Sequence, residues 1–196
     1  LKKDKVHINR WWYPAIEKNE NINFEKAAHT IKNKFFENIQ THLRSDVPIG
    51  AALSGGIDSS ATVCAIRYLY PNREINTFSY IAKNSNFSEE KWIDKINDYT
   101  KAKSHKIFVD IDNLSSELDN IIKIQGEPFL DTSILAEYLV FKEAKKKGIK
   151  VILEGQGGDE LLGGYYGYPG ARLHSLISEK KYIEAYKFSK NWKKLH

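Results

Sequence analysis

The chain has 196 residues, of which 41% are hydrophobic, 12% are aromatic and 28% are charged. This composition is too apolar for a disordered chain, and the length suits one domain with an arm at either end. Lys and Arg exceed Asp and Glu by 30 to 25, and this small, dispersed excess does not favour a nucleic-acid-binding module. No apolar run approaches the ~20 residues of a membrane span, and no signal peptide is visible.

The cysteine and histidine residues do not indicate a disulfide, a nucleophile or a zinc site. Cys64 is the single cysteine, so no internal disulfide forms, which fits a reducing, cytoplasmic compartment. It lies on the apolar face of an expected helix, which favours packing over a nucleophile. The six histidines show no ligand spacing, so a zinc site is not expected. Because the sequence contains no methionine, we expect a piece of a longer polypeptide.

Residues 1–22 are polar and rich in asparagine, and they include the aromatic group Trp11-Trp12-Tyr13-Pro14. We interpret this stretch as an arm packed on its own domain, with a docking patch as the alternative. Apolar residues then recur at helical spacing over 24–43, and Pro48 follows the end of that helix. The expected strands are 49–53, 75–81, 104–109 and 149–153, and the expected later helices are 59–70, 88–102, 113–125, 132–147 and 172–192.

Strands that alternate with helices predict an α/β fold with a parallel sheet and helices on both faces. In the helix over 88–102, Ser88 is the expected N-cap, and Trp92, Ile93 and Ile96 are expected on the inner face. Such sheets bind ligands beyond the carboxyl ends of their strands. Glycine-rich loops follow the first and fourth expected strands, so we expect the functional site there.

The first of these loops reads Ser54-Gly55-Gly56-Ile57-Asp58-Ser59-Ser60. Its two glycines allow a sharp turn that brings backbone amides close to an anion, and its hydroxyls and the following helix add donors. No Gly-Lys-Ser/Thr follows, so it is not a Walker A loop. An acid in a phosphate cradle is unfavourable without a cation between them, so Asp58 predicts Mg²⁺. The alternative is a plain turn in which Ser and Asp cap the helix.

Four ordered motifs make the sequence similar to the asparagine synthetase family of N-type ATP pyrophosphatases. The first loop resembles the pyrophosphate loop of this PP-loop superfamily, and Ser45-Asp46-Val47-Pro48 before it resembles the family's Ser-Asp-Val-Pro. Glu127-Pro128-Phe129 with Asp131-Thr132-Ser133 resembles a Glu-Pro-Phe segment, and residues 155–165 resemble a second glycine loop. The resemblance implies a Rossmann-like sheet of the adenine nucleotide alpha hydrolase type.

The resemblance also implies an ATP-dependent carbon–nitrogen ligase. In the family, a substrate carboxylate attacks the α-phosphate of ATP to give an acyl-adenylate and pyrophosphate, and ammonia then displaces AMP. By position, Asp58 and Asp159 are the implied Mg²⁺ ligands, and Glu127 and Asp131 shape the acceptor pocket or cap a helix. The implied pyrophosphate-binding residues are Ser54, Gly55, Gly56, Asp58, Ser59 and Ser60, and the implied adenine neighbours are Ala52, Leu53, Ser79, Tyr80 and Gly155.

One position departs from the family pattern. Asparagine synthetases usually carry an acid after the first glycine of the second loop, near the adenylate and the attacking ammonia, and here that catalytic position holds Gln156. Glutamine can hydrogen-bond a carbonyl or ammonia, but it is no base at neutral pH. Glu154, where a serine is common, is an alternative group for that role. Glutamine in place of an acid at position 156 affects which acceptor carboxylate is expected more than it affects the expected adenylation chemistry.

The family architecture implies that residues 1–22 link an upstream glutaminase domain to a synthetase domain over 23–196 that is truncated at its C-terminus. The implied reaction converts aspartate to asparagine with ammonia from glutamine. The alternatives are another carboxylate (a sugar acid, a peptide or a β-lactam precursor) and a non-catalytic nucleotide-binding scaffold. We expect no nucleic-acid or membrane partner, and a homodimer is compatible with the sequence.

Overall fold

A computed structural model describes residues 8–15, 22–82, 88–108, 114–129, 131 and 133–195. The chain divides into two compact units, Leu1–Glu37 and Asn38–His196. In the first unit the Arg10 guanidinium lies 3.8 Å from the centre of the Tyr13 ring. Helix α1 (Phe24–His42) begins in this unit, where the Asn23 side chain accepts a hydrogen bond from the Lys26 amide at 2.9 Å and so caps the helix.

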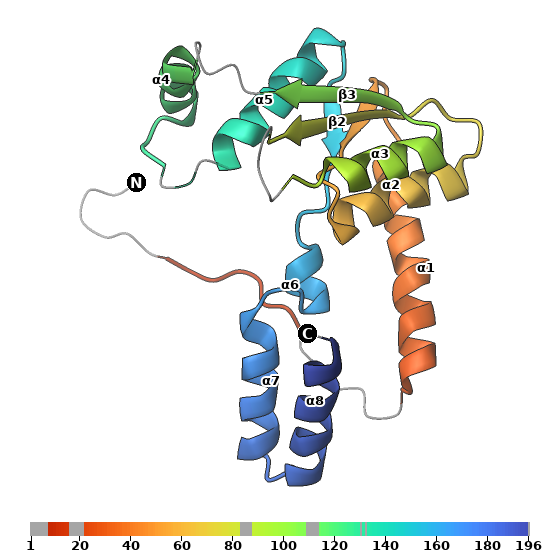
Figure 1. Ribbon diagram of the computed structural model, residues 1–196, viewed down its shortest axis with the longest axis vertical. Helices are drawn as coiled ribbons and strands as arrows, with labels where there is room; N and C mark the ends of the chain where they lie inside the picture. Colours follow the sequence, from red (N-terminus) through yellow and green to blue (C-terminus); the bar gives the residue numbers. More distant parts are fainter. Residues whose placement is uncertain are drawn as a thin grey trace. The chain divides into compact units, whose positions relative to one another are not determined.

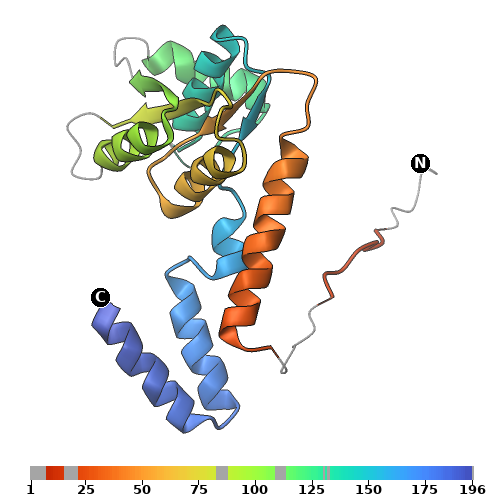
Figure 2. The same ribbon diagram turned by 90° about the vertical axis from the view of Figure 1, so that its right-hand side faces the viewer.

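The second unit is built on a four-stranded parallel sheet with the order β3-β2-β1-β4. Helices α2 and α3 cover one face, and α5 packs on the other against β2 and β3 (Figures 1 and 2). Its elements are β1 (Ile49–Ala52), α2 (Ile57–Leu69), β2 (Asn76–Ile81), α3 (Glu90–Thr100), β3 (Lys103–Phe108), α4 (Leu114–Gln125), α5 (Ser133–Lys146), β4 (Val151–Leu153), α6 (Gly158–Leu162), α7 (Gly167–Ser178) and α8 (Tyr182–Leu195). The predicted α/β fold is confirmed.

The two faces of the sheet differ in chemistry. On the α5 side, Phe78, Val140, Ala144 and Ile149 form an apolar cluster. On the α3 side, the buried Asn97 side chain accepts a hydrogen bond from Thr77 Oγ1 at 2.6 Å and donates one to Ser104 Oγ at 3.0 Å. Because side chains alternate along a strand, these contacts fix which residues of β2 face each layer.

The order of the strands fixes where a ligand can bind. From β1 the chain proceeds through β2 to β3 in one direction, whereas β4 pairs with the other side of β1. The register places Ala51 opposite both Thr77 of β2 and Leu153 of β4. Ligands bind in parallel sheets where the strand order reverses, beyond the carboxyl ends of the strands. The glycine-rich loops that follow β1 and β4 therefore lie next to each other at this point.

Some local expectations need correction. The tail over 172–192 is helical as expected, but it is interrupted: the chain turns at Lys180, whose φ is 58°, and forms the separate helices α7 and α8. Helix α6 was not expected. In α3, Trp92 is half exposed while Ile93 is buried. The N-cap position is Glu89, whose own side chain makes no cap hydrogen bond, while the Ser88 hydroxyl accepts a hydrogen bond from the Glu90 amide at 3.5 Å. The other bounds agree within two residues, although positions 109, 113 and 132 lie outside the described residues.

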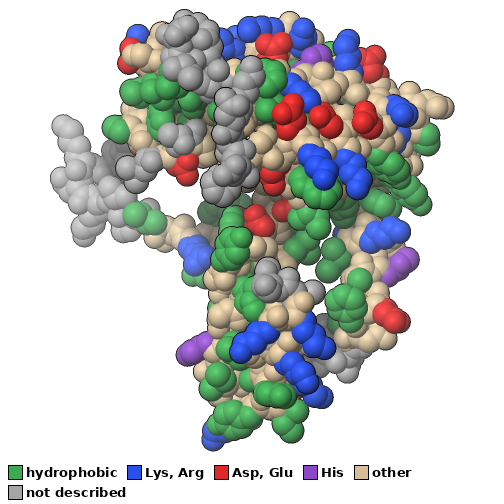
Figure 3. Space-filling model, in the orientation of Figure 1, with side chains coloured by type: hydrophobic (Ala, Val, Ile, Leu, Met, Phe, Trp, Pro, Cys, Tyr) green, Lys and Arg blue, Asp and Glu red, His purple; other side chains and the backbone are tan. Residues whose placement is uncertain are grey.

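The surface of the α7–α8 hairpin is rich in lysine, as Figure 3 shows, and α8 alone carries Lys187, Lys190, Lys193 and Lys194. Within the hairpin, Leu176 and Ala185 are buried between the helices. Among the described helices, none has the length and apolar character to cross a membrane.

Candidate functional site

A cleft of about 620 Å³ opens at the carboxyl ends of β1, β2 and β4, where the strand order reverses. One wall is the loop from Ser54 to Ser59, and the facing wall is the first half of α5. The residues after β4 form the third side, with Gly155, Gln156 and Asp159. The topology thus brings together segments that lie up to about a hundred residues apart in the sequence, as expected for a parallel sheet.

Serine side chains hold the first loop in shape. The Ser54 amide donates a hydrogen bond to Ser59 Oγ at 3.2 Å, and the two hydroxyl oxygens lie 3.0 Å apart. The Ser59 hydroxyl donates to the Gly56 carbonyl at 3.2 Å, and the Gly56 amide donates to Ser54 Oγ at 3.2 Å. Gly55 has φ 92°, and a Cβ there would lie 2.8 Å from Glu89 Cβ, so only glycine fits this turn. The loop is therefore rigid through its own contacts.

The two glycine-rich loops pack against each other without room for side chains. A Cβ on Gly155 would lie 2.8 Å from the Ser59 amide nitrogen and 3.0 Å from Asp58 Cβ. A Cβ on Gly158 would lie 2.6 Å from the Asp58 carboxylate. Gly157 between them has φ 88°, a conformation that glycine adopts readily. These contacts place the Asp58 carboxylate against the start of α6.

Asp58 and Asp159 both line the cleft, and their chemistry fits the Mg²⁺ that the sequence predicts. A Cβ on Gly164 would meet Asp159 Oδ1, so this carboxylate lies over the end of α6. Within the described residues, no three His, Cys, Asp or Glu side chains converge on one point. Mg²⁺ in nucleotide sites is held by one or two carboxylates and completes its shell with phosphate oxygens and water. Two aspartates in one cleft therefore suit a metal that arrives with a nucleotide.

Two further carboxylates lie on the α5 side of the cleft. Glu137 of α5 and Glu154 after β4 both line it. Partial burial raises the pKa of the Glu154 carboxyl above its ordinary value, and the negative charge of Glu137 raises it further. Phe78, Ala136 and Val140 form the apolar part of the same wall. This side of the cleft is therefore both apolar and negatively charged.

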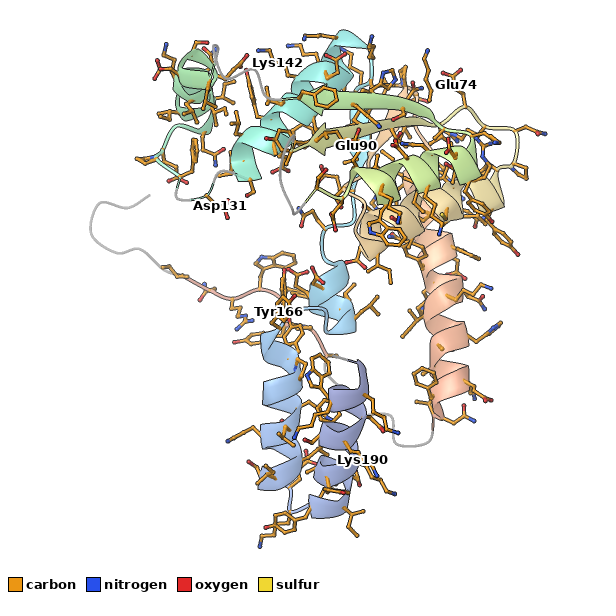
Figure 4. All side chains as sticks on the ribbon, in the orientation of Figure 1. Glu74, Glu90, Asp131, Lys142, Tyr166 and Lys190 are labelled. Atoms are coloured by element: carbon orange, nitrogen blue, oxygen red, sulfur yellow. The ribbon has the colours of Figure 1, made fainter. Side chains whose placement is uncertain are left out.

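Three tyrosines, Tyr165, Tyr166 and Tyr168, lie at the end of the second loop and just beyond it. The Tyr165 hydroxyl donates a hydrogen bond to the Glu160 carboxylate at 2.7 Å, which raises the pKa of Tyr165 to about 12. Its ring packs edge-on against Tyr168 at 5.6 Å between centroids. Tyr166, labelled above α7 in Figure 4, is almost fully exposed.

The cleft collects most of the residues that the sequence singles out. Ser79 is completely buried on β2, and because it shares a face with Thr77 it lies on the α3 side of the sheet, away from the cleft. Asp131 lies just before α5 in Figure 4, and its carboxylate accepts a hydrogen bond from the Ser133 amide at 2.7 Å, a capping contact. Predicted site residues in the lining are Ala52, Leu53, Ser54, Gly56, Asp58, Ser59, Tyr80, Gly155, Gln156 and Asp159; those outside it are Gly55, Ser60, Ser79, Glu127 and Asp131.

The α5 wall is the part of the site that sequence reasoning missed. Ala136 and Val140 are four residues apart on α5, with Glu137 beside them, and all three line the cleft. The available signal was an apolar helix face interrupted by one acid just after the Asp131-Thr132-Ser133 motif. The sequence does not show that this helix end faces the two glycine-rich loops.

Comparisons with known proteins converge on one family. The family model described as asparagine synthase matches residues 30–196. A putative glutamine-hydrolysing asparagine synthetase from Methanocaldococcus jannaschii is 33% identical over 163 residues, which is 83% of this chain and 31% of that protein. Asparagine synthetase 1 from Bacillus subtilis is 35% identical over 150 residues, 72% of this chain and 22% of that protein. The chain therefore spans about a third or less of these relatives.

Among solved structures, an NH3-dependent NAD synthetase from Campylobacter jejuni superposes with a TM-score of 0.46 and 24% identity, covering 72% of this chain and 63% of that one.

Proposed function

Because the chain belongs to the asparagine synthase family, we propose that its polypeptide is an ATP-dependent ligase that makes an amide through an acyl-adenylate. The observation that supports this most is the packing of the two glycine-rich loops around Asp58 at the strand reversal. The proposed substrates are aspartate and ammonia, the latter released from glutamine by another domain, as the names of the relatives suggest.

The first loop suits the triphosphate of ATP. Its backbone amides and the start of α2 offer donors and a positive dipole end, which stabilise the α-phosphate and the departing pyrophosphate. Asp58 and Asp159 would hold Mg²⁺, which neutralises negative charge as the P–O bond breaks. Because Ser59 is bonded within the loop, its role in this proposal is to fix the loop, and the amides bind the phosphates.

The reaction then has two steps. A carboxylate oxygen of the acceptor bonds to the α-phosphorus, and the bond to pyrophosphate breaks. The ammonia nitrogen next bonds to the acyl carbon, AMP departs with the electrons of the C–O bond, and the nitrogen loses a proton to water. Gln156 lines the cleft and can orient the acyl carbonyl or the ammonia through hydrogen bonds, but it does not take the proton.

The identity of residue 156 favours a second candidate acceptor. Glutamine at this position removes a carboxylate from the place where the acyl group would lie, which suits an acceptor that differs from aspartate. A sugar acid, a peptide or a β-lactam precursor would use the same adenylation chemistry. This alternative changes the substrate and keeps the roles of both loops.

The test is to identify the nucleotide product. The whole polypeptide is incubated with Mg·ATP, an ammonium salt and a panel of carboxylic acids that includes aspartate. Formation of AMP with an equal amount of pyrophosphate supports the proposal, and dependence on aspartate supports asparagine synthesis. Formation of ADP contradicts the role of the first loop, and nucleotide binding without turnover on any acid favours a scaffold.

A further inference from the structure

Two of the twelve glycines have a carboxylate group in the space that a side chain would fill. A Cβ on Gly158 would lie 2.6 Å from both Cγ and Oδ2 of Asp58. A Cβ on Gly164 would lie 1.8 Å from Oδ1 and 2.9 Å from Cγ of Asp159. At the other glycines, the nearest atoms among the described residues belong to no carboxylate group. The two carboxylates that fill these spaces are those of the two proposed Mg²⁺ ligands.

The turn at the end of α6 brings Gly164 over Asp159. The amides of Gly163 and Gly164 both donate hydrogen bonds to the Asp159 carbonyl at 3.0 Å. Gly163, with φ 73°, ends the helix in the left-handed conformation that is common at helix C-termini. The hydrogen bond from Tyr165 to Glu160 spans the same turn. The chain therefore returns over residue 159, and the missing side chain at position 164 leaves the room that the carboxylate occupies.

An alanine at position 164 would act on the carboxylate before it acts on the backbone. Gly164 is not among the glycines with a left-handed φ, so its backbone conformation admits alanine. The closest obstructing atoms form the end of the Asp159 side chain, which can turn to another rotamer. At Gly155, in contrast, two of the three obstructing atoms belong to the backbone. Gly164 thus offers a way to move one carboxylate while the packing of the two loops is kept.

We propose that Gly164 is a positioning residue, which holds the Asp159 carboxylate in the orientation that binds Mg²⁺. This inference rests on the proposed function, because it takes ATP with its metal as the ligand of the cleft. Gly164 does not line the cleft, whereas Asp159 does, so the glycine acts through the aspartate. Residues that orient a metal ligand change metal affinity about 10- to 100-fold when they are replaced.

The experiment measures the ATP dissociation constant of the whole polypeptide in excess Mg²⁺ and again in EDTA. The ratio of the two constants gives the affinity that the metal adds. Gly164→Ala should lower this ratio about tenfold or more, while the constant in EDTA and the guanidinium unfolding midpoint stay near their wild-type values. Gly167→Ala is the matched control, because it lies three residues further on and no atom within 4 Å obstructs a Cβ there.

A double-mutant cycle tests whether Gly164 acts through Asp159. Asp159→Ala removes the carboxylate, so adding Gly164→Ala to it should leave the Mg²⁺ ratio unchanged. Additive losses in the double variant would overturn the inference. If Gly164→Ala alone lowers the unfolding midpoint, the double variant should recover it, because the obstructing group is gone. A midpoint that stays low would show that the backbone is the obstruction, and this too would overturn the inference.

The remaining outcomes separate this inference from the proposed function. Equal weakening of ATP in Mg²⁺ and in EDTA by Gly164→Ala shows a purely structural role and overturns the inference. Wild-type protein that forms AMP, beside a Gly164→Ala variant that keeps the full ratio, overturns the inference alone. If the ratios follow the expectation but no acid yields AMP, the inference stands and the proposed ligase activity fails. Absence of ATP binding by the wild type overturns both.

Discussion

Replacing Gly155 with alanine tests whether the contact between the two glycine-rich loops builds the site. The new Cβ would lie 2.8 Å from the Ser59 amide nitrogen and 3.0 Å from both the carbonyl carbon and the Cβ of Asp58. Ordinary contacts between such atoms need ~3.5 Å, so the loops must separate by well over half an ångström. Two of the three obstructing atoms belong to the backbone, which cannot rotate away as the end of a side chain can.

Overpacking of this kind costs about 1–3 kcal/mol in the free energy of unfolding. The displacement also moves Asp58 and the amides of the first loop, and misplacement by ~1 Å can cost about a hundredfold in rate. The assays are guanidinium unfolding and the ATP dissociation constant of the whole polypeptide. Gly170→Ala is the control, because no atom within 4 Å obstructs a Cβ there and alanine favours a helix interior. Wild-type stability and ATP affinity in Gly155→Ala would refute the packing argument.

Three further predictions concern the metal, the core and pH. Asp58→Asn should lower Mg²⁺-dependent ATP turnover at least tenfold while leaving the unfolding midpoint near that of the wild type, and an unchanged rate would remove Asp58 from the metal site. Asn97→Ala should lower the free energy of unfolding by about 2–4 kcal/mol, because it removes the hydrogen-bond partner of the Thr77 and Ser104 side chains. The control Asp98→Ala, at an exposed position, should change this free energy by under about 0.5 kcal/mol. Burial, helped by the charges of Lys147 and Lys103 and opposed by Glu143, lowers the pKa of His105 below 6.5. His105 therefore binds more protons in the unfolded protein than in the folded protein. Its contribution to the free energy of unfolding is complete above pH ~6.5 and is lost as the pH falls through the lower folded-state pKa. His105→Gln should flatten this part of the stability profile, and equal slopes in both proteins would contradict the assignment.

The sequence was sufficient to predict the sheet and both loops because each depends on local patterns. Short apolar runs bounded by Pro48 or glycine predict buried strands, and Ser-Gly-Gly after a strand predicts a turn. The left-handed φ of Lys180, which separates α7 from α8, has no comparable signal, because lysine rarely adopts it. The buried polar network around Asn97 was also not predictable, since its partners Thr77 and Ser104 come from two different strands.

The candidate site likewise has a part that local motifs predict and a part that depends on tertiary packing. The residues of the two loops were predicted from their motifs, whereas Glu137 and Val140 enter the cleft because α5 packs across β2 and β3. Ser79 shows the reverse case. It is adjacent to Tyr80 in sequence, but the alternation of side chains places it on the opposite face of the sheet, where its hydroxyl makes no hydrogen bond with the described residues.

The hydrogen bonds of the first loop bear on how such a site would act. Electrostatic stabilisation is most effective when the donors are already oriented, because no energy is then needed to reorganise them during the reaction. Ser54 and Ser59 hold the turn through four contacts among themselves and Gly56. Gly155 closes against the same backbone from the second loop. If the hydrogen bonds of Ser59 orient the amides of the first loop, Ser59→Ala should lower the affinity for ATP, even though the Ser59 hydroxyl is bonded within the loop and does not itself contact the phosphates. Ser60→Ala is the control, since Ser60 lies outside the lining of the cleft. A larger loss of affinity in the Ser60 variant would show that a free hydroxyl, and not the rigidity of the loop, binds the phosphates.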